Sequence, residues 1–305
     1  MNKYENFLLS YKEKHNNLMV LTVENRSAIR DISNILGNSF IDVGIAEQSM
    51  VGISAGLALC NKLPIIHGLA SFLTMRSFEF IRTDIGYPNL TIKLVGTFSG
   101  FLSEGNGPTH QAIEDIALMR NIPNMNIFCP ADEDDLILGL EDVFNSPNPF
   151  YIRYNDLKAI EKHKKFEMGK SETFSEGNDV SILVYGVLFN QAIKALSKLK
   201  KKGIKARVIN LRTLKPIDKK KILKILDNSD LIVTLEDHFK VGGLFSIMAE
   251  IMAGGKIYNK ILPISLDERW FKPSLFNDVL EHEGYTAEQI SKKIYKYLTK
   301  GKNVK

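Results

Sequence analysis

A chain of 305 residues that is 44% apolar, 25% charged and 9% aromatic has globular proportions, which exclude a disordered or fibrous protein and favour two domains. Its net charge of +5 is small and dispersed, which argues against nucleic acid as a partner. Two cysteines, no run of 18 apolar residues and a polar N-terminus argue against a disulfide framework, a membrane-spanning helix and a signal peptide, so we expect a cytoplasmic protein.

The first half of the chain alternates short apolar runs with longer helical patterns. The runs lack strict apolar–polar alternation, as is typical of strands in a sheet that is covered on both faces. Alternation of strands and helices indicates a parallel α/β sheet. The predicted strands are Leu18–Val23, Pro64–His67, Leu90–Gly96, Met125–Cys129 and Phe150–Tyr154, and the predicted helices cover about residues 46–61, 71–84, 109–120 and 132–145.

A polar stretch from Asn155 to Asp179, rich in Lys, Glu and Ser, predicts a domain boundary. The strand–helix pattern then restarts. Its predicted strands are Val180–Tyr185, Ala206–Leu211, Leu231–Leu235 and Ile261–Ser265, with helices near residues 188–201, 217–227, 242–253 and 286–299. We therefore predict a first domain over residues 1–160, a linker over 161–178 and a second domain over 179–305, each domain a mostly parallel sheet flanked by helices.

The segment FIDVGIAEQSMVGISAGL, residues 40–57, predicts a short strand followed by a helix. Gly52 and Gly56 are four residues apart and share one helix face, which we interpret as a site of tight helix packing. Glu47 stands at the start of this apolar helix. Its carboxylate either only favours the positive end of the helix or takes part in catalysis, and the residues alone leave both interpretations open.

A second segment, SEGNGPTHQAIED at residues 103–115, combines a glycine-rich turn with several polar side chains. Thr109 suits the N-cap of a helix. The turn presents Asn106, His110 and Gln111 together. It is either a capped loop with an incidental histidine or a ligand-binding loop at the end of a parallel strand.

These two segments resemble the C-terminal half of transketolase, the thiamine-diphosphate enzyme that moves two-carbon ketol units between sugars. Further matching phrases are ASFLTMRSFEFIRTDIGYPNL, GPTHQAIEDIALMRNIPNM, PADEDDL, FYIRY, ARVINLRTLKPID and VTLEDHFKVGGLFS. The resemblance spans about residues 15–298. It implies a thiamine-diphosphate pyrimidine-binding domain followed by a transketolase C-terminal domain.

The resemblance also implies a partner chain. Full-length transketolases begin with a further domain that binds the cofactor diphosphate through Mg²⁺, with a Gly-Asp-Gly signature and a later Asn. No Gly-Asp-Gly occurs in this sequence. The chain therefore resembles one subunit of a split transketolase, inactive alone, without a metal site of its own, and assembled with an N-terminal subunit as two copies of each chain.

By this resemblance, Glu47 matches the glutamate that hydrogen-bonds the aminopyrimidine ring and activates the cofactor. An apolar wall must stack on that ring. Leu73 falls where relatives often have a stacking Phe, and the neighbouring aromatics Phe72 and Phe78 are the other candidates. His67 ends a strand at the expected cofactor edge of the sheet.

The substrate contacts that the resemblance implies are His110, Gln111, Asn106 and Arg153. His110 matches a histidine that contacts sugar hydroxyls or the reacting oxygen, so we place it with Glu47 among the catalytic residues. Arg153 matches an arginine that grips the sugar phosphate, a task that suits a guanidinium. Its alternative interpretation is a surface arginine on an edge strand.

Three positions depart from the family pattern. Asn106 replaces an acidic residue, Phe98 replaces a histidine that assists the phosphate, and Glu24 replaces a phosphate-contacting serine. A carboxylate repels phosphate. We therefore hypothesise that the substrate differs from the ordinary pentose phosphates and is an unphosphorylated or nucleotide-linked sugar, for example one used in surface-polysaccharide synthesis.

Two other functions stay open at this stage. One is half of a related thiamine-diphosphate enzyme, a 2-oxoacid dehydrogenase β subunit or a deoxyxylulose phosphate synthase; the other is a binding subunit without catalysis. Among the remaining histidines, His238 fits a structural and a functional role equally, and His15, His163 and His282 lie in charged segments that we expect to be exposed.

Overall fold

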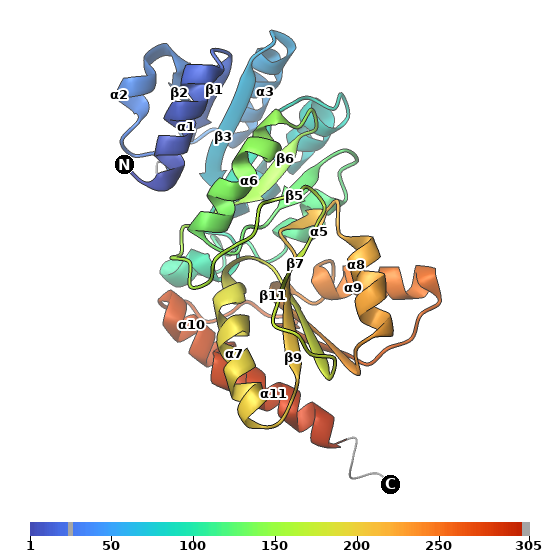
Figure 1. Ribbon diagram of the computed structural model, residues 1–305. Helices are drawn as coiled ribbons and strands as arrows, with labels where there is room; N and C mark the ends of the chain where they lie inside the picture. The colour runs from blue at the N-terminus through green and yellow to red at the C-terminus, as the bar shows by residue number, and fades with distance from the viewer. Residues whose placement is uncertain (24–26, 301–305) are drawn as a thin grey trace.

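A computed structural model describes residues 1–23 and 27–300 of the chain. It contains two sheets, each covered by helices on both faces (Figure 1). The strand order is β10-β5-β6-β4-β3-β1-β2 in the first sheet and β12-β11-β8-β9-β7 in the second. The predicted fold class, two α/β domains with mostly parallel sheets, is confirmed.

The first sheet is parallel apart from one strand that comes from the second half of the chain. That strand is β10, Thr213–Lys215, which pairs antiparallel with β5. The parallel strands are β1 Leu18–Thr22, β2 Phe40–Asp42, β3 Leu63–Leu69, β4 Lys93–Thr97, β5 Asn126–Phe128 and β6 Phe150–Arg153. The helices of this domain are α1 Lys3–Lys14, α2 Ser33–Leu36, α3 Glu47–Leu59, α4 Phe78–Phe80, α5 Asp115–Arg120 and α6 Glu133–Asn145.

The second sheet has four parallel strands and one antiparallel edge strand, β7. Its strands are β7 Glu172–Phe174, β8 Val180–Val184, β9 Ala206–Asn210, β11 Leu231–Phe239 and β12 Ile261–Leu266. The helices of this part are α7 Phe189–Lys201, α8 Lys219–Asp227, α9 Leu244–Gly255, α10 Phe276–Glu283 and α11 Ala287–Lys300. Figure 1 shows α7 with α11 on one side of this sheet and α8 with α9 on the other.

Successive residues of each strand bury against opposite faces, which explains the continuous apolar runs. In β1, Val20 belongs to a core with Leu8 of α1, whereas Leu21 belongs to a core with Met50 of α3. The core that contains Leu21 also continues into α8 and α9 of the second domain. No helix within residues 1–23 and 27–300 is long and apolar enough to cross a membrane.

Three stretches differ from the predicted elements. The predicted linker, residues 161–178, is folded: it contributes strand β7, and Phe166 within it is buried in the first-domain core. The predicted helix over 71–84 is two π-helical turns, Phe72–Arg76 and Ile81–Gly86, on either side of α4.

The predicted helix over 109–120 begins only at Asp115, so Thr109 is not its N-cap. The turn before α5 is held by other bonds. Gly100 donates its backbone N–H to the carbonyl of Ala112 over 2.8 Å, and the hydroxyl of Thr109 contacts its neighbour His110. The first of these bonds ties Ala112 to the loop after β4, and the second lies within the turn itself.

Candidate active site

Glu47 is the first residue of α3, and its side chain is only 3% exposed. Arg76 donates from one terminal nitrogen to both carboxylate oxygens of Glu47, at 3.0 Å each. The helix N-terminus adds partial positive charge. A carboxylate buried in an apolar helix is therefore compensated by one guanidinium and by the end of its own helix.

Phe72 and His110 extend this arrangement. The carbon at the centre of the Arg76 guanidinium lies 4.1 Å from the Phe72 ring centroid, which is a cation–π contact. The ring centroids of Phe72 and His110 are 5.0 Å apart. We call Glu47, Arg76, Phe72 and His110 the Glu47 cluster. The structure thus brings together three residues that the sequence predicted, from three segments, and adds Arg76.

Sequence reasoning missed Arg76 because its partner lies 29 residues away. The π-helical turn Phe72–Arg76 brings the arginine over the phenylalanine, and π-turns are frequent at functional sites. The one available signal was an arginine four residues after an aromatic residue, Phe72. That spacing is common in ordinary amphipathic helices.

The loop that carries His110 also carries Asn106. His110 is half-buried, and the hydroxyl of Thr109 lies 2.8 Å from its Nδ1, which orients the ring. Asn106 is exposed and donates to the carbonyl of Ser103 over 3.2 Å. Both predicted substrate contacts therefore reach the surface of the chain.

Three other predicted site residues, Leu73, Gln111 and His67, are buried within the chain, and their contacts with cofactor or substrate stay predictions. Leu73 is fully buried in the core of the first domain, so the half-buried Phe72 is the ring available for stacking. Gln111 is also buried, and it donates to the carbonyl of Phe271 in the second domain over 2.9 Å. Phe78 is partly buried and packs against the same core as Leu73.

The third buried residue is His67. Tyr4 lies 2.8 Å from its Nε2, and the carbonyl of Leu21 lies 3.1 Å from its Nδ1. Burial lowers the pKa of His67 to about 4, so the imidazole is neutral. Both nitrogens of His67 are thus bonded inside the chain, and a contact with the cofactor stays a prediction.

Arg153 lies in β6 between two other strands, so the alternative of a surface arginine on an edge strand is wrong. Its Nε is 2.9 Å from Asp115 and its Nη1 is 2.7 Å from Asp237 of the second domain. Burial raises the pKa of Asp237, and the arginine charge opposes this shift. Both ion pairs lie within the chain, and a phosphate contact by Arg153 stays a prediction.

Two further histidines, His238 and His163, are buried within the chain. The Nε2 of His238 accepts from the backbone N–H of Ala117 over 3.3 Å, and burial lowers the pKa of this histidine to about 4. His163 is buried rather than exposed, and each nitrogen lies 2.8 Å from a carboxylate, Asp132 or Glu172. Burial opposes the charge, but these hydrogen bonds outweigh it and raise the pKa of His163 to about 10.

Phe98 follows β4 and lines a cavity of about 220 Å³ together with Tyr154 and Leu157. Its φ of 55° is a strained value for a residue with a bulky side chain. Among the described residues, the charged side chains that line this cavity are Glu104 and Asp156. Two carboxylates disfavour a phosphate here. Glu24, the other departure on which the sugar hypothesis rests, lies outside the described residues.

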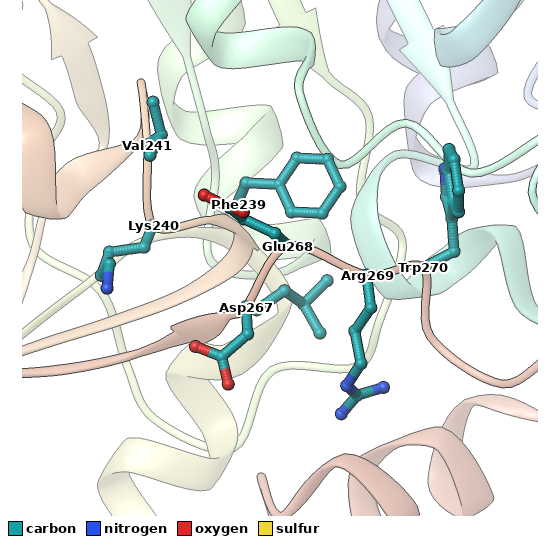
Figure 2. A pocket seen from close by; sticks show the side chains of 8 residues that line it. Phe239, Lys240, Val241, Asp267, Glu268, Arg269 and Trp270 are labelled. Carbon is teal, nitrogen blue, oxygen red and sulfur yellow. The ribbon is translucent and has the colours of Figure 1, made fainter.

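A separate cavity of about 670 Å³ lies in the second domain, after the ends of β11 and β12 (Figure 2). Its lining includes Phe239, Asp267, Arg269 and the exposed Trp270. These residues do not belong to the Glu47 cluster. This cavity is therefore separate from the candidate active site.

Comparison with known families agrees with this architecture. Residues 9–159 match the transketolase pyrimidine-binding domain, and residues 169–290 match the transketolase C-terminal domain. These two matches, in this order, define a transketolase-type protein. The chain belongs to the transketolase family.

Relatives of similar length identify the part of transketolase that the chain represents. It is 32% identical to a putative transketolase C-terminal section of Methanocaldococcus jannaschii, over 97% of this chain and 95% of the relative. It is 31% identical to the 6-deoxy-6-sulfo-D-fructose transketolase subunit SqwH of Clostridium sp., over 94% and 90%. The prediction of a C-terminal subunit of a split transketolase is confirmed.

Two other similarities are informative. A solved structure described as "Split gene transketolase, inactive beta4 tetramer" aligns with a TM-score of 0.88 at 32% identity, over 97% of each chain. The 1-deoxy-D-xylulose-5-phosphate synthase of Dictyoglomus thermophilum is 36% identical over 85% of this chain, but over only 42% of its own length. The alternative enzyme class therefore shares the same two domains inside a longer chain.

Proposed function

We propose that this chain is the subunit of a split transketolase that activates thiamine diphosphate, and that it transfers a two-carbon ketol unit from a ketose to an aldose only when an N-terminal subunit is bound. The observation that carries the proposal is the Glu47 cluster. It holds a buried carboxylate next to an aromatic ring and a half-buried histidine, on a chain whose relatives are named as transketolase subunits.

The residues of the cluster fit one part of this cofactor. Glu47 would hydrogen-bond the aminopyrimidine ring and share a proton with a ring nitrogen, and Phe72 would stack on the ring. Phe72 contacts both Arg76 and His110. His110 would bind hydroxyl groups of the sugar. When bound, thiamine diphosphate supplies a carbon nucleophile and an electron sink. The partner subunit would hold its diphosphate and Mg²⁺.

The exposed face of α3 supports association with other chains. Among the described residues, no atom outside the helix lies within 4 Å of where a Cβ would stand on Gly52 or Gly56, so the predicted tight packing on this face would have to come from another chain. Ile45, Ile53 and Leu59 beside them are exposed by 71%, 41% and 71%. An apolar surface of this kind favours a protein partner. We propose an assembly of two copies of each chain.

The surroundings of Phe98 support a sugar other than the ordinary pentose phosphates. Phe98, Glu104 and Asp156 line the small cavity after β4, where cationic side chains would suit a phosphate. Among the relatives, one is named for 6-deoxy-6-sulfo-D-fructose and another for apulose 4-phosphate. These names support a sugar other than the ordinary pentose phosphates, which we propose for this chain; an unphosphorylated or nucleotide-linked sugar stays the more specific prediction from the sequence.

The test is ketol transfer by this chain with and without its N-terminal partner, in thiamine diphosphate and Mg²⁺, with products followed by mass. We expect turnover only with both chains, and a loss of roughly 100- to 10,000-fold in Glu47→Gln. Glu79→Gln, at an exposed carboxylate on the nearby helix α4, is the matched control and should keep full activity.

The failures are distinguishable. Full turnover in Glu47→Gln would indicate a binding subunit without catalysis. Condensation of pyruvate with glyceraldehyde phosphate would indicate a deoxyxylulose phosphate synthase instead, and acyl transfer to lipoamide a 2-oxoacid dehydrogenase. Normal rates on xylulose 5-phosphate and ribose 5-phosphate would disprove the unusual sugar and leave the transketolase assignment in place.

A further inference from the structure

We infer that Arg76 is a placeholder for the cofactor: in the free chain its guanidinium occupies the two surfaces, Glu47 and Phe72, that would receive the aminopyrimidine ring, and cofactor binding displaces it. The inference rests on the proposed function and deepens it. It assigns a positioning role to a residue that the sequence patterns did not identify.

The contacts of Arg76 are the first evidence. One nitrogen donates to both oxygens of Glu47 at 3.0 Å, and the guanidinium lies 4.1 Å from the Phe72 ring centroid. A guanidinium is planar and delocalised, so it stacks and donates hydrogen bonds much as a protonated aminopyrimidine does. The same pair of contacts, a carboxylate and an aromatic face, is what the ring of the cofactor requires.

The space between Arg76 and Phe72 is the second piece of evidence. Non-bonded carbon atoms sit about 3.5 to 4.0 Å apart, so a planar ring between two groups needs a gap of about 7 Å. The observed 4.1 Å leaves no room for such a ring. The cofactor can therefore stack on this face of Phe72 only after the guanidinium has moved.

The burial of the two partners shows which one can move. The Glu47 side chain is 3% exposed, whereas that of Arg76 is 44% exposed. The Arg76 side chain can withdraw into water without uncovering a core. Its backbone stays anchored, because Gln48 donates to the Arg76 carbonyl over 3.2 Å and Arg76 closes the π-helical turn.

Displacement has a calculable consequence for affinity. A protein whose competent form is a fraction f of the population binds with an apparent Kd equal to the intrinsic Kd divided by f. The ion pair and the cation–π contact of Arg76 together favour the form in which its guanidinium covers Glu47 and Phe72, by a factor of roughly 5 to 30. Removing the guanidinium should tighten cofactor binding by a factor in this range.

The experiment is isothermal titration of thiamine diphosphate, at saturating Mg²⁺, into the assembled complex of this chain with its N-terminal partner. We expect Arg76→Met to lower Kd roughly tenfold, because Met cannot pair with Glu47 and lacks the cation–π contact that holds the Arg76 side chain over Phe72. Arg82→Met, at an exposed arginine in the next π-turn, is the matched control and should leave Kd unchanged.

Arg76→Lys covers the case in which Arg76→Met does not assemble, since it keeps the charge but loses the planar group. We expect its Kd to lie between those of the wild type and Arg76→Met. An unchanged or raised Kd in the Arg76 variant that assembles, with measurable binding by the wild type, would overturn the placeholder alone. No cofactor binding by the wild-type complex would overturn the proposed function and the placeholder with it.

Discussion

Replacing Arg153 with Met decides whether this guanidinium joins the two domains or binds a substrate. Arg153 in β6 pairs with Asp115 of the first domain at 2.9 Å and with Asp237 of the second at 2.7 Å. The arginine side chain is 3% exposed and both carboxylates are fully buried. The variant would leave two carboxylates in one buried space without a counter-charge.

Removing one partner of a buried ion pair costs about 3 to 5 kcal/mol, most of it from the charge left behind. In a chain of this size, 1 kcal/mol lowers Tm by about 2 to 4 °C, so we expect Arg153→Met to lower Tm by roughly 6 to 20 °C. Urea unfolding and differential scanning calorimetry measure the loss. Lys198→Met, which breaks a surface pair with Glu288, should cost at most about 1 kcal/mol.

Adding Asp237→Asn should recover part of the lost stability, because it removes one of the two unpaired charges. An Arg153→Met chain with an unchanged unfolding midpoint and a raised KM for the sugar would refute the structural argument. That result would instead support the phosphate contact that the family resemblance predicts for Arg153.

Three further predictions concern stability and assembly. The pKa of His163 is raised to about 10 in the folded chain against about 6.5 in an unfolded one. Its contribution to stability is therefore complete below about pH 6.5 and is lost as pH rises toward 10. The unfolding free energy of His163→Gln should not show this fall between about pH 6.5 and 10. A Cβ on Gly100, where φ is +55°, would stand 1.7 Å from an oxygen of Asp237. Gly100→Ala should therefore lower the free energy of unfolding in urea by more than about 2 kcal/mol. Gly105→Ala, where a Cβ would meet open space, is the control and should be nearly neutral. Ala at both Gly52 and Gly56 should stabilise the isolated chain by about 1 kcal/mol per site and weaken its complex with the partner, as measured by analytical ultracentrifugation.

The fold was predictable because burial on both sheet faces leaves a signal that survives in a single sequence. Runs such as those of β1 and β8 are apolar throughout, since alternate residues enter different cores. Strand β10 was not predictable. Thr213–Lys215 is short and pairs with β5 across the domain junction, so its strand character comes from tertiary contacts that no local pattern encodes.

The site was predictable only where a motif fixes a residue's surroundings. Phe72 and His110 are in contact as members of one cluster, and both were candidates from the sequence. Gln111 follows His110 directly yet turns inward to the carbonyl of Phe271, because one step along a tight turn reverses the direction of a side chain. His67 is likewise decided by register: it pairs with Thr22 of β1 and faces Tyr4 of α1.

Helix α3 carries both the proposed catalytic carboxylate and the face on which another chain would dock. Glu47 opens this helix, and the open glycines Gly52 and Gly56 lie one to three turns further along it. Because a helix moves as a rigid unit over this length, a chain that docks on the glycine face also fixes the position of the Glu47 carboxylate. Arg76 contacts Glu47 from the exposed side, so a docked partner restricts where the displaced guanidinium can go. Cofactor binding and subunit association should therefore be coupled. The coupling is reciprocal: the factor by which assembly tightens the binding of thiamine diphosphate equals the factor by which thiamine diphosphate tightens assembly.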